Sequence, residues 1–224
     1  MPPHSAPNQH KPARGHDLAG LAVRLLSEPL GEPHLAGCPS DFDLNPDAGL
    51  NAENGTPGSS LTPAAVLVPI LTGGEKLSVL LTERTAHLAQ HAGQIAFPGG
   101  KIESTDQGPL AAALREAHEE IGLESRYVAP LGYIEPYRTG TGFLVTPVIA
   151  AIKPGFTLAP DAAEVADVFE VPFDFLMDTA NHRIDTLFWR GADRRFYAMP
   201  YGNRYIWGAT AGIIRTLHRR LFSA

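Results

Sequence analysis

A short run of charged residues near the middle of the chain has the composition of a site for a divalent cation. It reads Arg115-Glu116-Ala117-His118-Glu119-Glu120. On a helix, Glu116 and Glu120 project from one face, because they are four apart, and Glu119 lies beside them. These carboxylates repel one another, and no lysine lies nearby at helical spacing to offset them. Their hard oxygens are typical ligands of Mg²⁺ or Mn²⁺, so the run is predicted to bind one of these cations.

Two neighbouring elements are expected to position this run. Residues 111–114 are good helix formers, and Gly122 is a typical helix end. Gly99 and Gly100 form a short loop before the helix, and glycine allows a close approach of the backbone. A carbonyl of this loop can therefore point at the same place as the carboxylates. The alternative is a solvated acidic helix face, which is the common fate of a charge run.

The stretch from Gly99 to Leu123 resembles the signature of Nudix hydrolases. The second half of that signature is complete, and its positions are Arg115, Glu116, Ala117, Glu119, Glu120, Gly122 and Leu123. The loop between Gly100 and Arg115 has one residue more than the signature usually has. The first acidic position is therefore either Glu103 or Asp106.

The resemblance implies a role for each charged residue of the run. Glu116, Glu119 and Glu120 would be the metal ligands, together with the carbonyl of Gly100. Glu119 would also act as the catalytic base. Arg115 would pair with a carboxylate of the signature and orient the cluster.

Segments outside the signature resemble the coenzyme A diphosphatase subgroup of this family. They are Leu80–Thr85, Leu88, His91, Gly93-Gln94, Phe97–Gly100, Pro136–Phe143, Thr146–Val148, Glu164-Val165 and Ile206–Thr210. Ala89 departs from the subgroup, which often has a basic residue there. The resemblance implies metal-dependent hydrolysis of coenzyme A or its derivatives to 3′,5′-ADP and (acyl-)4′-phosphopantetheine. The alternatives are another nucleoside diphosphate conjugate, such as ADP-ribose, or a Nudix-fold module that binds without turnover.

Four residues are candidates for binding this substrate. Arg84 and Arg138 can hold phosphates, because a guanidinium matches two phosphate oxygens. His91 can donate to a phosphate, and Tyr137 can stack on adenine. The alternatives are an ion pair for Arg84, with Glu83 or another acid, and a structural role for His91. Glu164 can be an auxiliary metal ligand or a member of a structural salt bridge.

Apolar patterning predicts an α/β (α+β) fold with a mixed sheet, as in the Nudix α/β/α sandwich that the resemblance implies. Strands are expected at 64–71, 77–82, 94–97, 127–135, 143–152, 184–189 and 195–199. Helices are expected after Asp17, from Pro172 to Met177, and from Ile206 to Leu221, besides the acidic helix. The segment 161–165 is expected to be a loop or a helical turn.

Composition and charge indicate how the chain is divided into segments and which partners and compartment it is expected to have. Residues 1–15 are expected to be a disordered tail. Residues 16–62 are expected to form a helix and an irregular arm, which wraps the surface or a second subunit of a homodimer. Residues 63–224 are expected to form the Nudix domain. The net charge of −6 argues against a binder of nucleic acid polymers. The single cysteine, Cys38, fits the reducing cytoplasm. No apolar run is long enough to span a membrane, which takes about 18 residues.

Overall fold

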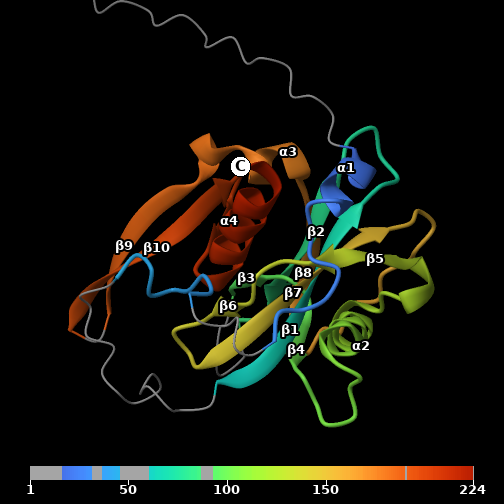
Figure 1. The fold of residues 1–224 in the computed structure, drawn as a ribbon, viewed down its shortest axis with the longest axis horizontal. Coiled ribbons are helices and arrows are strands. Elements are labelled where there is room, and N and C mark those ends of the chain that lie inside the picture. The colour runs from blue at the N-terminus through green and yellow to red at the C-terminus, as the bar shows by residue number, and fades with distance from the viewer. Residues whose placement is uncertain (1–16, 32–36, 46–60, 87–92, 190, 224) are drawn as a thin grey trace, which may run out of the picture.

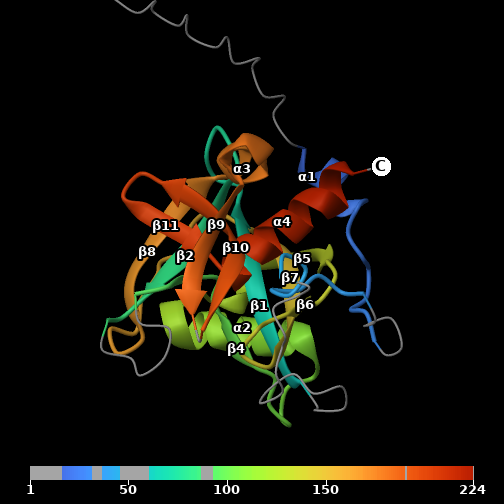
Figure 2. The same cartoon turned by 90° about the vertical axis from the view of Figure 1, so that its left-hand side faces the viewer.

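The computed structural model describes residues 17–31, 37–45, 61–86, 93–189 and 191–223. A mixed sheet forms the centre, with helix α2 on one face and helix α4 with a smaller sheet on the other (Figures 1 and 2). The helices are α1 (Leu18–Ala22), α2 (Pro109–Ile121), α3 (Phe173–Met177) and α4 (Ala209–Phe222), with single turns η1 (Ser125–Tyr127) and η2 (Thr179–Asn181). The strands are β1 (Thr62–Leu71), β2 (Ser78–Arg84), β3 (Ile95–Ala96), β4 (Gly99–Lys101), β5 (Val128–Tyr133), β6 (Tyr137–Arg138), β7 (Phe143–Ile152), β8 (Val165–Pro172), β9 (Arg183–Trp189), β10 (Ala192–Tyr201) and β11 (Arg204–Trp207). The expected α+β sandwich with a mixed sheet is confirmed.

Strand β1 is the centre of the larger sheet. It runs parallel to β7 along its whole length, from Thr62 opposite Phe143 to Leu71 opposite Ile152. On its other edge it forms the predicted hairpin with β2 and an antiparallel ladder with β4. Because β1 is covered on both faces, its sequence is almost continuously apolar, as is typical of buried central strands.

The two faces of this sheet carry separate cores. Leu80 and the apolar side of α2 belong to one core. Val79 and Leu81, next to Leu80 in β2, belong to the other core, with α3, α4 and the smaller sheet. Neighbouring residues of β2 thus point to opposite faces, as the period of a strand requires.

Several predictions from the sequence need correction, and the short strands β4 and β6 were not expected. Strand β8 was not expected, and it pairs antiparallel with β2. Strand β11 was not expected either, and the last helix begins at Ala209 rather than at Ile206. Ile206 and Trp207 are instead strand residues, because they pair with Met199 and Ala198 of β10. Helix α3 and the β9–β10 hairpin form as predicted.

The N-terminal segments lie against the larger sheet. Asp17 caps α1 as expected, because its side chain accepts from the Ala19 amide at 3.2 Å. The described part of the irregular arm includes Ser40, which forms a parallel bridge with Arg138. The predicted tail at 1–15 lies outside the described residues, as do 32–36 and 46–60 of the arm. None of the described helices has the length and apolarity needed to cross a membrane.

Candidate active site

Helix α2 forms where the acidic helix was predicted, and its packing fixes the direction of its acids. Ala113, Ala117 and Ile121 are buried on the core that α2 shares with the sheet. Gly122 ends the helix in the left-handed conformation, with φ 68°, which glycine adopts without strain. The carbonyls of Glu120 and Ile121, at the end of the helix, accept from the amides of Asp161 and Ala159. The segment that leads to Glu164 is therefore attached to the end of α2.

Arg115 is tied to Asp106 by two hydrogen bonds. Its Nε donates to Asp106 Oδ1 at 3.1 Å, and its Nη2 donates to Asp106 Oδ2 at 2.9 Å. The Arg115 guanidinium holds the pKa of the Asp106 carboxyl below its usual range. Glu103 instead contributes its backbone amide, which donates to Asp106 Oδ2. Of the two acids that the sequence left open, the structure pairs Asp106 with the arginine.

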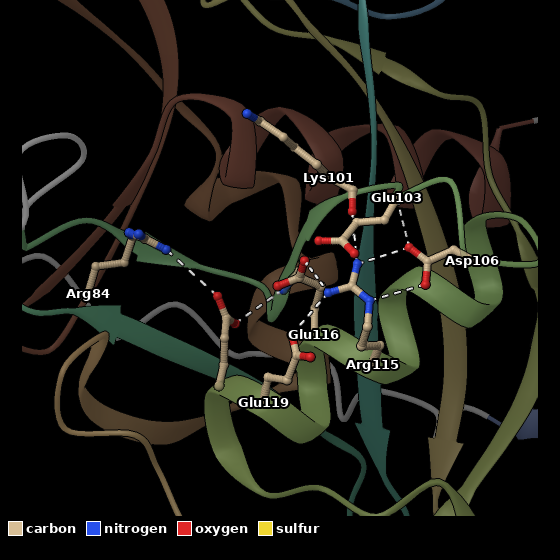
Figure 3. Close-up of polar contacts among 9 residues, drawn as sticks. Arg84, Lys101, Glu103, Asp106, Arg115, Glu116 and Glu119 are labelled. Carbon is tan, nitrogen blue, oxygen red and sulfur yellow. Dashed lines mark hydrogen bonds and ion pairs between the residues drawn. The ribbon is translucent and has the colours of Figure 1, made fainter.

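The other side of the Arg115 guanidinium faces two of the predicted metal ligands (Figure 3). Its Nη1 donates to Glu116 Oε1 at 2.9 Å and to Glu119 Oε2 at 3.0 Å. The Glu116 side chain is mostly buried, whereas that of Glu119 is 56% exposed. One cationic nitrogen thus reaches both carboxylates, and Glu119 stays open to water.

The two glycines before α2 are residues of strand β4 rather than of a loop, and Gly100 lies against Glu116. Strand β4 pairs with β1, which places Gly100 opposite Ala65. A β-carbon built on Gly100 would lie 2.4 Å from Glu116 Oε1, and one on Gly99 would lie 2.4 Å from the Ala65 carbonyl oxygen. Only glycine fits at such contacts. The backbone of β4 therefore adjoins the Glu116 carboxylate.

Glu120 is the most buried acid of the group, with 6% of its surface exposed. Its Oε2 accepts from the Gly99 amide at 3.2 Å, and its Oε1 lies 3.7 Å from Nη1 of Arg84. Burial raises the pKa of Glu120 to about 7, although the Gly99 amide and Arg84 act in the opposite direction. Burial also raises the pKa of Glu116. Glu164 contributes to both increases by repulsion.

These residues have the chemistry of a site for a divalent cation. Two neighbouring carboxylates have raised pKa values, and a third acid, Glu164, repels both. A bound cation would offset this repulsion, and carboxylate oxygens suit Mg²⁺ or Mn²⁺. In the part of the chain that the structure describes, no three acidic, histidine or cysteine side chains already converge as a closed metal site. Glu116 and Glu119 are instead held by Arg115, and Glu120 faces Gly99 and Arg84.

The predicted substrate-binding residues are not gathered in one place. Arg84 adjoins the acids and is 27% exposed, and its ion pair is with Glu120 rather than with Glu83. Arg138 lies against the arm, with its guanidinium 5.1 Å from the centre of the Phe42 ring. Tyr137 is 3% exposed and donates to Asp41 Oδ1 at 2.9 Å, so its ring offers no surface for a base in this structure. His91 lies outside the described residues.

Comparison with known proteins shows that this chain is similar to the members of one family. A family model described as the NUDIX domain matches residues 61–188. A curated relative from Enterobacter sp. (strain 638), called uncharacterized Nudix hydrolase NudL, is 42% identical over 154 residues, which are 69% of this chain and 80% of the relative. NudL of Escherichia coli (strain K12) is 40% identical over the same shares.

Solved structures similar to part of this chain include two proteins with NUDIX domains. The Nudix hydrolase RenU from M. smegmatis is 28% identical with a TM-score of 0.42, and the match covers 50% of this chain and 71% of RenU. The NUDIX domain of Shewanella oneidensis NrtR, solved with ADP ribose, is 22% identical with a TM-score of 0.40, and the match covers 51% and 74% of the two chains.

Proposed function

This chain belongs to the Nudix hydrolase family, and from that premise we propose that it is a divalent-metal-dependent diphosphatase that cleaves coenzyme A or its derivatives. The products would be 3′,5′-ADP and 4′-phosphopantetheine, or its acyl form. The observation that carries the proposal is the set of three acids on α2 beside the Gly99–Gly100 backbone.

The acids would hold the metal on which hydrolases of this family generally depend. We assign Glu116, Glu119, Glu120 and the Gly100 carbonyl as its ligands. Mg²⁺ or Mn²⁺ bound there would neutralise the diphosphate and lower the pKa of the attacking water.

Three side chains would take the proton of the attacking water, orient the acids and contact a phosphate. Glu119 is exposed, so its carboxylate can take the proton of the attacking water. Arg115 is held by Asp106 and orients Glu116 and Glu119 through Nη1. Arg84, which pairs with Glu120, would contact a phosphate oxygen if a bound cation offset the Glu120 charge.

The choice of coenzyme A rests on the segments that resemble the coenzyme A diphosphatase subgroup. Two of them would contribute to the proposed site. Leu80–Thr85 includes the end of β2 with Arg84, and Phe97–Gly100 includes Gly99 and Gly100 of β4. The chain is acidic overall, so an anionic substrate depends on such local arginines and on metal.

A substrate panel tests the proposal. Coenzyme A, acetyl coenzyme A, ADP-ribose and a dinucleotide polyphosphate are each incubated with the chain and Mg²⁺ or Mn²⁺, with EDTA as the control. The expected result is release of 3′,5′-ADP from the coenzyme A substrates, which stops in EDTA. A much higher kcat/KM for ADP-ribose would reject coenzyme A as the substrate. Binding of coenzyme A without any product would reject catalysis and favour a binding module.

A further inference from the structure

An arginine of the smaller sheet lies between two acids of the larger sheet. Arg204, the first residue of β11, donates through Nη1 to Glu83 Oε2 at 2.9 Å and through Nη2 to Asp167. Its guanidinium carbon lies 3.6 Å from the centre of the Phe169 ring. The guanidinium is thus fixed by two carboxylates and an aromatic ring, and 22% of the side chain is exposed.

The two acids are directly opposite each other in the sheet. Glu83 of β2 pairs with Asp167 of β8. Like charges at such a position repel and destabilise the pairing of the strands. Arg204 bridges both carboxylates, so it turns a repulsive cross-strand pair into an attractive group of three.

The pair lies next to a β-bulge. After Glu83 and Asp167 the register shifts, so that Arg84 pairs with Val165 and Ala166 has no partner across the ladder. A bulge bends a strand and redirects its side chains. Here the extra residue belongs to β8, so the bulge bends β8 opposite Arg84, whose guanidinium reaches Glu120 on α2.

Glu83 and Arg84 point to opposite faces of the sheet. Val79 and Leu81, which share the face of Glu83, pack with the core that contains α4. Leu80, which shares the face of Arg84, packs with α2. Holding Glu83 on one face therefore helps to hold the backbone from which Arg84 projects on the other face, because the two residues share one peptide unit.

We infer that Arg204 is a positioning residue for Arg84: it holds the Glu83–Asp167 pair and thereby sets the bulge that presents the Arg84 guanidinium at the acidic site. The inference rests on the proposed function only for the role of Arg84 toward a phosphate. It assigns a task to β11, which lies beyond the residues that the family model matches.

A double-mutant cycle tests this inference. R84A, R204Q and R84A/R204Q are compared with the wild-type chain on whichever diphosphate that chain cleaves best. R204Q is expected to raise KM roughly three- to tenfold with little change in kcat, because it misplaces a phosphate contact. In the R84A background, R204Q is expected to add no further rise, since a residue that acts through Arg84 has nothing left to position.

Two further variants separate positioning from a general loss of stability. D167N removes one of the repelling charges, so R204Q/D167N is expected to recover much of the wild-type KM. R219Q, on the exposed side of α4, is the matched control for loss of an arginine charge and is expected to leave KM unchanged. A lower melting temperature in R204Q with an unchanged KM, or effects of R84A and R204Q that simply multiply, would overturn the inference.

Hydrogen exchange gives a readout that does not need turnover. The Arg84 amide donates to the Gln94 carbonyl and the Thr85 amide to the Glu164 carbonyl, both at 2.9 Å. Exchange at these two amides is expected to speed up in R204Q and to slow again in R204Q/D167N. Unchanged exchange in R204Q would overturn the inference even if the chain cleaved no substrate of the panel. Failure to cleave coenzyme A alone would reject only the proposed substrate.

Discussion

Gly100 lies so close to Glu116 that a β-carbon on the glycine would be 2.4 Å from the carboxylate oxygen Oε1. The contact joins strand β4 to the helix that carries the acids. It also makes the site sensitive to the smallest possible change in the strand.

We predict that G100A lowers kcat by about 100-fold, because the added methyl group displaces Glu116, and a shift of about 1 Å in a catalytic group can have an effect of this size. Steady-state kinetics at saturating metal checks this. G31A is the matched control, since a β-carbon on Gly31 would meet nothing within 4 Å. A G100A enzyme with the kcat of the wild type would show that the Glu116 position does not matter for turnover.

E119Q is predicted to reduce kcat by about 10²- to 10⁴-fold while the melting temperature stays near that of the wild type, because glutamine has almost the same shape but cannot accept the proton of water. E164Q, measured in parallel, tests the other acid near the cluster. E124Q removes a carboxylate just beyond α2, where Glu124 pairs with Arg126, and serves as the control. If E164Q lost turnover and E119Q kept it, the base would be Glu164.

Glu120 is predicted to make the stability of the metal-free chain depend on pH. The folded-state pKa of about 7 lies above the ordinary value of 4.5, so the folded chain binds this proton more tightly than the unfolded chain. The stabilisation is complete below the ordinary pKa and is lost as the pH rises through about 7, by at most about 3 kcal/mol.

Denaturant unfolding of the wild type and E120Q in EDTA, at about pH 5 and about pH 8, measures this loss. The wild type is expected to lose stability relative to E120Q at the higher pH. Added Mg²⁺ is expected to restore more stability there, because metal and proton compete for the carboxylate. A difference between the two proteins that does not change with pH would contradict the raised pKa.

D106N is predicted to lower kcat, whereas E103Q is predicted to leave it unchanged. Asp106 accepts both the Nε and Nη2 bonds of Arg115, so its loss frees the guanidinium that orients Glu116 and Glu119. Glu103 contributes a backbone amide, which the substitution keeps. Kinetics of the two variants under identical conditions decides the matter, and greater damage from E103Q would reverse the assignment.

The features that the sequence predicted well depend on local patterns. Helix α2, its end at Gly122 and the β1–β2 hairpin each follow from residues close together in the chain. The choice between Glu103 and Asp106 could not be made in this way, because it depends on how the loop folds back on Arg115.

Contacts between segments that are far apart in the chain could not be predicted from the sequence. Strand β8 was missed because Asp167 and Glu170 interrupt its apolar pattern, and its partner β2 lies far away in the chain. Arg204 reaches Glu83 across 121 positions. Tyr137 was a candidate for stacking on adenine, yet Asp41 and Gly212, from two remote segments, enclose its hydroxyl.

The parallel pairing of β1 with β7 also has a consequence for the order of folding. Thr62 pairs with Phe143 and Leu71 pairs with Ile152. Strand β2 and the whole of α2 lie between β1 and β7 in the chain, so β1 cannot complete this pairing until β7 has been made. Closing so long a loop is entropically costly before any contact compensates for it, so this step is expected to be slow. During synthesis on the ribosome, α2 and its acids would leave the exit tunnel before β7, the strand that completes the sheet on which α2 packs.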